Sequence, residues 1–293
     1  MGHLDGKRIV ITGSTRGLGR AFAEEMASAG AKVVINGTRA DLVADVVAGI
    51  RSAGGTATGF TGSIAEEATA AGMVRTCVET WGGIDTIVHN AGIVRDKTLL
   101  KMTAEEFDDV IAVHLRGAFF CIKHAGLAMK DTGGGHIILV ISASGLSGGF
   151  GQGNYAAAKE GMMGLQRTAV LELSKSNIRC NCMWPIAETD MTQVVFERAN
   201  AAARAAGSTP PQPVDMGFGK PHEVAQGMVW LASDKAAHLQ GQCLTFNGRK
   251  TALWSHPAEV GVTFHPDAWS VEELDAHYRE AAQQAIWRPK MVR

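Results

Sequence analysis

The chain has 293 residues, of which 46% are hydrophobic and 19% are charged. This composition is ordinary for a globular protein, and the length suffices for one large α/β domain or two small ones. The formal net charge is −1 at pH 7. The charge balance therefore gives no reason to expect nucleic acid or an anionic membrane as a partner.

Signal, membrane and metal motifs are missing from the sequence. The start, Met-Gly-His-Leu-Asp-Gly-Lys, has no apolar signal segment. No apolar stretch is expected to reach the ~20 residues that a membrane span needs. The five cysteines form no CxxC motif and the histidines have no metal-ligand spacing, so we expect buried thiols and no metal site. These features predict a cytoplasmic protein.

The first elements form a βαβ unit. Residues 7–12 predict a buried strand, a glycine turn covers 13–19, a helix follows as far as Gly30, and residues 31–36 predict a second strand. In this setting a glycine-rich turn indicates a dinucleotide site, because the backbone can approach the pyrophosphate at the N-terminus of the helix.

Strands and helices continue to alternate along the chain. Further strands are predicted at 56–60, 84–88, 137–141, 178–183 and 242–246, and further helices at 40–53, 65–80, 103–130, 154–175, 190–206 and 221–232. Such alternation predicts an α/β fold, with a parallel sheet that is covered by helices on both faces.

The stretch 141–159 carries the chemistry that the sequence suggests. Ser142 follows an apolar strand, and Tyr155 and Lys159 open the next helix on one face. A nearby ammonium group is expected to lower the pKa of the phenol and make Tyr155 a proton shuttle, with Ser142 as a donor to a carbonyl oxygen. A Tyr-x-x-x-Lys pair by itself is more often an ordinary helix face.

The tail from residue 250 differs in composition. It contains three of the six tryptophans, namely Trp254, Trp269 and Trp287. Ser270 and Glu273 have the spacing of a capping box, which predicts a helix. The tail could cover the site, bind a neighbouring subunit or simply pack.

With these motifs in order, the sequence resembles the short-chain dehydrogenase/reductase family. The motifs are Thr12-Gly-x-x-x-Gly-x-Gly19, Asn90-Ala-Gly92, Ser142 and Tyr155-x-x-x-Lys159. The resemblance implies a single Rossmann-type domain, 1–249, with a parallel sheet of about seven strands, followed by a C-terminal helical extension, 250–293. It also implies hydride transfer between a nicotinamide and a carbonyl or secondary alcohol.

The resemblance also implies residue roles. Tyr155 would be the acid/base, Ser142 would hold the substrate oxygen, and Lys159 would bind the cofactor ribose and lower the pKa of the tyrosine. The implied cofactor site comprises Gly13, Thr15, Arg16, Gly17, Leu18, Gly19, Gly37, Arg39, Ser63, Asn90, Ala91, Gly92, Tyr155, Lys159, Pro185 and Thr189. The family implies a homodimer or homotetramer formed through the two long helices.

Two departures from the family pattern point to a subgroup. His114 stands where most members have an asparagine that supports a proton relay, and Pro185-Ile186-Ala187 replaces the usual Pro-Gly. Both are similar to the (3R)-hydroxyacyl-CoA dehydrogenase domains of peroxisomal multifunctional enzymes type 2 (17β-hydroxysteroid dehydrogenases type 4). His114 could relay a proton, since imidazole both donates and accepts, or could only brace the helix.

The end of the second strand bears on the choice of cofactor. NAD-preferring members have an acidic residue there, but this chain has Gly37, followed by Thr38 and Arg39. Arg39 could pair with a 2′-phosphate, so the sequence favours NADP over NAD. Gly62-Ser63 replaces an aspartate that is often found after the third strand, so we expect the adenine to be held mainly by backbone.

The substrate remains open between several classes. A 3-hydroxyacyl or 3-ketoacyl thioester is the first hypothesis, and a steroid, cyclic ketone or aromatic alcohol is the second. The segment 194–219 is expected to form a substrate lid, in which Arg198 and Arg204 could meet a CoA phosphate or only be solvated. A non-catalytic nucleotide sensor or scaffold is the alternative from another class.

Overall fold

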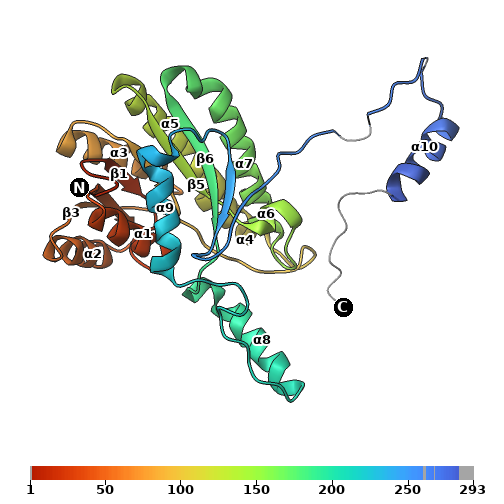
Figure 1. Cartoon of the computed structure of the whole chain (residues 1–293), viewed down its shortest axis with the longest axis horizontal. Coiled ribbons are helices and arrows are strands. Elements are labelled where there is room, and N and C mark those ends of the chain that lie inside the picture. Colours follow the sequence, from red (N-terminus) through yellow and green to blue (C-terminus); the bar gives the residue numbers. More distant parts are fainter. Residues whose placement is uncertain (1, 260–261, 267, 284–293) are drawn as a thin grey trace. The chain divides into compact units, whose positions relative to one another are not determined.

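The computed structural model describes residues 2–259, 262–266 and 268–283. The chain divides into two compact units, Met1–Trp254 and Ser255–Arg293. The first unit extends beyond residue 249, because the short strand β8 (Thr251–Leu253) pairs with the sheet. Figure 1 shows the chain coloured along the sequence.

The first unit is built on one eight-stranded sheet. Its strand order is β3-β2-β1-β4-β5-β6-β7-β8. Seven strands are parallel, as predicted, and β8 adds an antiparallel edge strand that the sequence did not predict. The bounds of the parallel strands are Arg8–Ile11, Lys32–Gly37, Thr56–Thr61, Thr86–His89, Gly135–Val140, Ile178–Pro185 and Cys243–Phe246.

One face of the sheet is covered by α1 (Gly17–Ser28), α2 (Ala40–Ser52) and α9 (Pro221–Ala232). Phe22 and Met26 of α1 and Met228 of α9 are fully buried there against strand residues such as Ile9 and Ile35. Burial of such side chains stabilises the fold by roughly 1.5–3 kcal/mol each.

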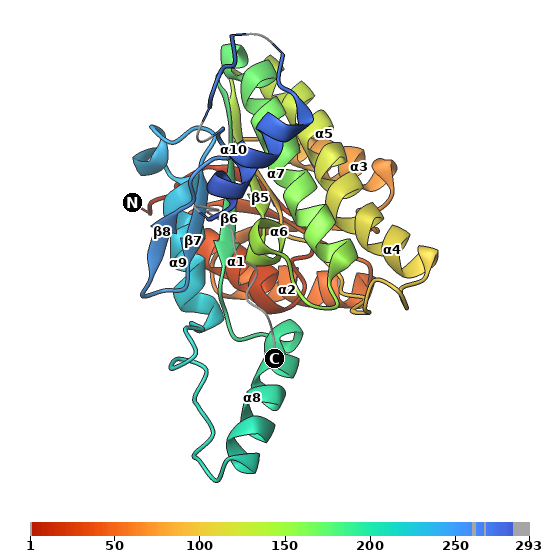
Figure 2. The ribbon, with the colours of Figure 1, turned by 90° about the vertical axis from the view of Figure 1, so that its right-hand side faces the viewer.

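The opposite face is covered by α3 (Glu67–Trp81), α5 (Gly117–Asp131) and α7 (Gly153–Leu173). Figure 2 shows α7 beside α5 and α4 (Ala104–Ile111), and these helices are in contact. All five cysteines are free and buried, and all five pack on this face.

A π-helical turn, η1 (Ala112–Arg116), joins α4 to α5. The resulting helix, Ala104–Asp131, is long and apolar enough by length and composition to cross a membrane. The expectation that no stretch reaches this length is therefore wrong. The composition has a structural reason, since Ala118, Cys121 and Met129 face the core while Phe119 and Leu127 lie exposed.

The segment after β6 leaves the sheet. The 3-10 turn Asp190–Thr192 leads into α8 (Gln193–Ala205), which extends away from the sheet in both views (Figures 1 and 2). A short helix, α6 (Ala143–Ser147), follows β5 and packs on α7.

The second unit contains the predicted tail helix, α10 (Val271–Gln283). The capping box is confirmed, because Ser270 N donates to Glu273 Oε2 at 2.9 Å and Glu273 N donates to Ser270 Oγ at 3.3 Å. Trp269 lies between His265 and His277, with ring centroids 5.0 and 5.2 Å away. Trp254 belongs to the first unit, and Trp287 lies outside the described residues.

Candidate active site

The glycine turn after β1 has the geometry of a dinucleotide site. The strand order reverses between β1 and β4, and ligands bind in such crevices at the carboxyl ends of the strands. Gly13 and Gly17 have φ values of 61° and 54°, which disfavour other residues. A Cβ on Gly19 would lie 2.1 Å from the oxygen of Gly13. The turn leads into the N-terminus of α1, which has no side-chain cap and can present its N–H groups to a phosphate.

Thr12 and Asn90 tie the turn after β1 to the turn after β4. Thr12 Oγ1 accepts from the backbone N–H groups of Asn90 at 3.0 Å and Ala91 at 2.9 Å. Asn90 Nδ2 donates to the oxygens of Thr12 at 3.2 Å and Gly13 at 3.1 Å. The two motifs that are far apart in sequence are therefore one rigid unit.

Asn36 is a positioning residue that the sequence did not reveal. Its side chain is buried, accepts from Gly13 N at 3.2 Å and donates to the oxygens of Phe60 at 3.2 Å and Gly62 at 3.1 Å. It fixes the ends of three strands around the glycine turn. An asparagine before Gly37 was visible, but only the pairing of β1, β2 and β3 gives it these partners.

The end of β2 contains the residues that bear on cofactor choice. A Cβ on Gly37 would come within 2.6 Å of Thr15 Cγ2, so Thr15 occupies the space into which a side chain at 37 would extend. Arg39 is exposed and paired with the exposed Asp41, with Nε 3.2 Å from Oδ1. Ser63 follows shortly after the end of β3. The residue before it, Gly62, donates its backbone N–H to the oxygen of Gly37 at 2.9 Å, which ties this turn to the end of β2.

Ser142, Tyr155 and Lys159 come together beyond the end of β5. Ser142 caps α6, Tyr155 and Lys159 are one turn apart on α7, and Lys159 Nζ lies 5.4 Å from the centre of the Tyr155 ring. Lys159 Nζ donates to the oxygen of Val140 at 2.6 Å. A Cβ on Gly145 would lie 3.0 Å from Lys159, so the glycine allows α6 to approach α7.

The electrostatics of this group differ from the prediction. Burial raises the pKa of Tyr155 to about 12, and the hydrogen bond with Ser142 opposes this only in part. Burial also lowers the pKa of Lys159 to about 7. The expectation that the pKa of the phenol is depressed is wrong, because removal from water disfavours the charged form of both groups.

His114 lies on the π-turn behind Tyr155. Its Nε2 is 2.8 Å from the oxygen and 3.1 Å from the nitrogen of Ile93, and its ring meets the Tyr155 ring edge-on at 5.1 Å. Burial, with a smaller effect of Lys159, lowers the pKa of His114 well below its usual value, so the ring is neutral. These contacts brace the loop after Gly92, and a π-turn is frequent at functional sites.

His89 extends this bracing to the glycine turn, and the sequence did not single it out. Its Nε2 is 2.9 Å from the oxygen of His114, and its Nδ1 is 3.3 Å from Thr12 Oγ1. Because a carbonyl only accepts, Nε2 carries the proton and Nδ1 accepts from Thr12. Burial lowers the pKa of His89 to about 3.

Pro185 and Thr189 follow the last part of β6. Pro185 ends the strand, and Thr189 begins the turn that leads into α8. A Cβ on Gly17 would meet the side chain of Thr189 at 3.9 Å, so Thr189 lies close to the glycine turn. Arg204 is exposed near the end of α8, and the side chain of Arg198 lies outside the described part of the structure.

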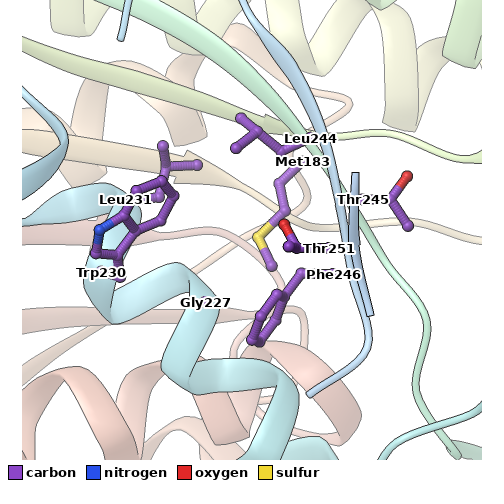
Figure 3. A pocket seen from close by; sticks show the side chains of 8 residues that line it. All are labelled: Met183, Gly227, Trp230, Leu231, Leu244, Thr245, Phe246 and Thr251. Atoms are coloured by element: carbon purple, nitrogen blue, oxygen red, sulfur yellow. The ribbon is translucent and has the colours of Figure 1, made fainter. Parts of the chain in front are cut away.

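The first unit also has a cavity that lies away from these residues. A cavity of about 290 Å³ lies between α9 and the edge strands, lined by apolar side chains that include Met183, Trp230 and Phe246 (Figure 3). Met183 belongs to the core on the α1 and α9 face, whereas α7 covers the other face. The cavity is therefore separate from Tyr155 and carries no group of the site.

The comparisons with known proteins agree with this geometry. The short chain dehydrogenase family matches residues 7–200. This chain is a short-chain dehydrogenase/reductase. A short chain dehydrogenase from Mycobacterium avium has a crystal structure with a TM-score of 0.83, 31% identity, and 98% of each chain covered.

Several relatives of this dehydrogenase/reductase have named activities. The hydroxyacyl-CoA dehydrogenase ChsB1 of Mycobacterium tuberculosis is 37% identical over 94% of this chain and 89% of its own. The 3-oxoacyl-[acyl-carrier-protein] reductase FabG of Aquifex aeolicus is 35% identical over 84% and 97%. The mouse peroxisomal multifunctional enzyme type 2 is 40% identical over 82% of this chain, which spans 31% of that enzyme.

The family fixes the type of reaction. The protein is an oxidoreductase that uses a nicotinamide nucleotide. The glycine turn fits this cofactor, because Gly13 and Gly17 adopt positive φ values, Gly19 packs against Gly13 and Asn90 where a Cβ would clash, and the N-terminus of α1 has no side-chain cap. When bound, the nicotinamide supplies the hydride acceptor or donor. The alternative of a non-catalytic sensor or scaffold has no support at this site, where Ser142, Tyr155 and Lys159 are together.

Proposed function

We propose that this short-chain dehydrogenase/reductase interconverts a 3-hydroxyacyl thioester and its 3-ketoacyl partner with NADP. The observation that carries the reaction is the meeting of Ser142, Tyr155 and the buried Lys159 beyond the end of β5. The thioester is supported by the names of relatives that match most of the chain, which include a hydroxyacyl-CoA dehydrogenase and a 3-oxoacyl-carrier reductase.

The chain's own groups handle the proton. Tyr155 gives its proton to the carbonyl oxygen during reduction and takes it back during oxidation. Ser142 donates a hydrogen bond to the same oxygen and stabilises the charge that develops there. Lys159 lies beside the phenol and is fixed by the oxygen of Val140.

NADP is supported by the end of β2. Position 37 is a glycine, so it has no carboxylate that would repel a 2′-phosphate. An acidic side chain there would collide with Thr15, which occupies the space. Arg39 is held only by an exposed pair with Asp41, and such pairs contribute roughly 0–1 kcal/mol. Arg39 can therefore exchange Asp41 for a phosphate at small cost.

The test is a comparison of substrates and cofactors. We expect acetoacetyl-CoA to be reduced with NADPH at a kcat/KM at least about tenfold above that with NADH. Arg39→Ala should abolish most of this preference, while Arg75→Ala, which removes an exposed cation from α3, should not. Inactivity on every acyl-CoA, with turnover of a steroid or cyclic ketone, would reject the thioester. A clear NADH preference that Arg39→Ala leaves unaltered would reject NADP.

We also propose a homodimer or homotetramer formed through the long helices. Phe119 and Leu127 of α5 and Leu171 of α7 are 46%, 57% and 80% exposed on one protomer. Apolar side chains of this size are usually covered. Light scattering on the purified protein should give a multiple of 30.9 kDa. Leu171→Glu should shift the measured mass towards that of the monomer. A monomeric wild-type protein would contradict the proposed oligomer.

A further inference from the structure

Asn154 joins three segments of the chain through one buried side chain. It lies in the first turn of α7, directly before Tyr155, and is fully buried. Its Nδ2 donates to the oxygen of Arg95 at 3.1 Å and to the oxygen of Glu106 at 2.9 Å, and its Oδ1 accepts from Tyr155 N at 2.7 Å. Because carbonyl oxygens only accept, these partners fix the orientation of the amide. The loop after β4, helix α4 and helix α7 are therefore held together at this point.

The same three segments surround the ring of Tyr155. The loop contains Ile93, whose backbone nitrogen and oxygen lie 3.1 and 2.8 Å from Nε2 of His114. Helix α4 leads directly into the π-turn that contains His114. The ring of His114 meets the ring of Tyr155 edge-on, with the ring centroids 5.1 Å apart. The path from Asn154 through the loop or through α4 to His114, and back to Tyr155, is therefore closed by direct contacts.

The fit of His114 against the loop is tight. A Cβ on Gly92 would lie 2.4 Å from Cε1 of His114, so the ring lies against the loop only because residue 92 has no side chain. The loop is tied once more to the segment before α7, where Lys97 N donates to Gly151 O at 2.8 Å. The imidazole therefore moves with the loop and the π-turn, and Asn154 sets the distance of both from α7.

The position of the phenol matters for proton transfer. A general acid/base must lie within hydrogen-bond reach of the group that it protonates, and a misplacement of about 1 Å can cost a large part of the rate. The backbone of α7 places Tyr155, and the edge of the His114 ring limits where its own ring can lie. A side chain that fixes α7 against the carrier of His114 therefore acts on the phenol through packing.

We propose that Asn154 is a positioning residue for this reaction, which holds α7 against the loop after β4 and against α4, so that the ring of His114 fixes the orientation of the Tyr155 phenol. The proposal rests on the proposed role of Tyr155 as the acid/base and deepens it. Asn154 acts through these backbone groups and the two rings.

Asn154→Leu keeps the approximate shape of the side chain and removes all three hydrogen bonds. We expect kcat to fall at least about tenfold, while the dissociation constant of the cofactor stays within about twofold of wild type. The melting temperature should fall as well, because buried backbone groups lose a partner. Stability alone does not distinguish a positioning residue from a merely structural one, so a control of equal burial is needed.

Asn181 is that control. It is also fully buried, its Nδ2 donates to the oxygen of Leu239 at 3.1 Å, and its Oδ1 accepts from Gln242 N at 2.8 Å. These partners precede β7, near the amino end of that strand, whereas Tyr155 lies beyond the carboxyl end of β5. Asn181→Leu should lower the melting temperature in the same way but keep kcat within about twofold of wild type. Equal losses of kcat in the two Leu variants would overturn the proposal.

Asn154→Asp separates the cap on α7 from the bridge to the loop and α4. A carboxylate still accepts from Tyr155 N and suits the N-terminus of a helix, but it cannot donate to the oxygens of Arg95 and Glu106. We therefore expect a loss of kcat of at least about tenfold here too. Wild-type kcat in Asn154→Asp would overturn the proposal, because the cap alone would then be sufficient.

A measurement without substrate tests the geometry itself. The chain has two tyrosines, Tyr155 and Tyr278, so in a Tyr278→Phe background every tyrosine ring signal comes from Tyr155. With protons kept only on the tyrosine and histidine rings, a nuclear Overhauser contact should join Tyr155 to one histidine, and its loss in His114→Gln assigns it. The contact should be lost in Asn154→Leu and Asn154→Asp and kept in Asn181→Leu. A contact that persists in both Asn154 variants would overturn the proposal.

Failure of the proposed function gives a different result. If no thioester is turned over but the ring contact depends on Asn154 as described, the substrate is wrong and the inference stands. If Tyr155→Phe keeps its rate, the acid/base role fails, whatever the ring contact shows. If thioesters are turned over and kcat is unaltered in Asn154→Leu, the inference alone fails.

Discussion

The two ends of the cofactor crevice are built on opposite physical principles. At the chemical end, Lys159 and His114 are 3% and 1% exposed, and their partners are backbone groups. At the end of β2, the proposed ribose site, the side chain of Arg39 is 66% exposed and its partner is an exposed carboxylate.

This difference decides which properties each end can have. At the chemical end, desolvation dominates, so the pKa of Tyr155 rises to about 12 and that of Lys159 falls to about 7. In the exposed end, water and salt weaken each pair, so contacts can be exchanged at small cost. We therefore expect catalysis to depend on the fixed end and cofactor choice to depend on the adjustable one. Changes at four residues test this contrast, from the largest expected effect to the smallest.

Tyr155→Phe should have the largest effect. It removes the proton donor and leaves the ring in its contacts with His114 and Lys159. We expect kcat to fall about 10³-fold, which is within the range for a positioned acid/base, while cofactor affinity changes little. Steady-state kinetics and fluorescence titration with the cofactor measure the two quantities. More than a tenth of the wild-type rate would show that another group donates the proton.

Changes at His114 separate bracing from proton relay. His114→Ala removes both contacts to Ile93, and we expect it to lower the free energy of unfolding by about 1–3 kcal/mol and to raise the KM for the cofactor. His114→Gln places an amide nitrogen near the position of Nε2. It should restore most of the lost stability and most of the cofactor KM. Denaturant unfolding and kinetics check this. If Gln restores stability but not kcat, the ring relays a proton after all.

Lys159 makes stability depend on pH in a defined window. Its pKa is lowered from 10.5 in the unfolded chain to about 7. Between these values the unfolded chain binds more protons, so stability rises with pH, by at most about 1.4 kcal/mol per pH unit, and this gain is lost below pH 7. Between pH 7 and 8.5, the free energy of unfolding of Lys159→Met should rise less than that of the wild type. Parallel curves for the two proteins would contradict the lowered pKa.

Asp41→Asn should have the smallest effect. It releases Arg39 from its exposed pair, so we expect the KM for NADPH to fall by about twofold and that for NADH to stay constant. The difference should shrink as the salt concentration rises. A KM for NADPH that rises instead would mean that the pair with Asp41 orients Arg39 for the phosphate.

Much of the fold could be predicted from local patterns. The glycine turn, the alternation of strands and helices, and the capping box of Ser270 and Glu273 each depend on residues close in sequence. Ser142, Tyr155 and Lys159 are brought together as their motifs indicated. These features need only the spacing of residues on one strand, turn or helix, and their energies are local.

The rest depends on partners that are distant in sequence. Strand β8 and the bracing by His89 and Asn36 arise from pairings that no local pattern contains. The direction of the pKa shift of Tyr155 was predicted wrongly for the same reason. The sequence places a cation one helical turn away, but only the packed structure determines how far both groups are removed from water. Charge can be read from a sequence, whereas desolvation is a property of the assembled core.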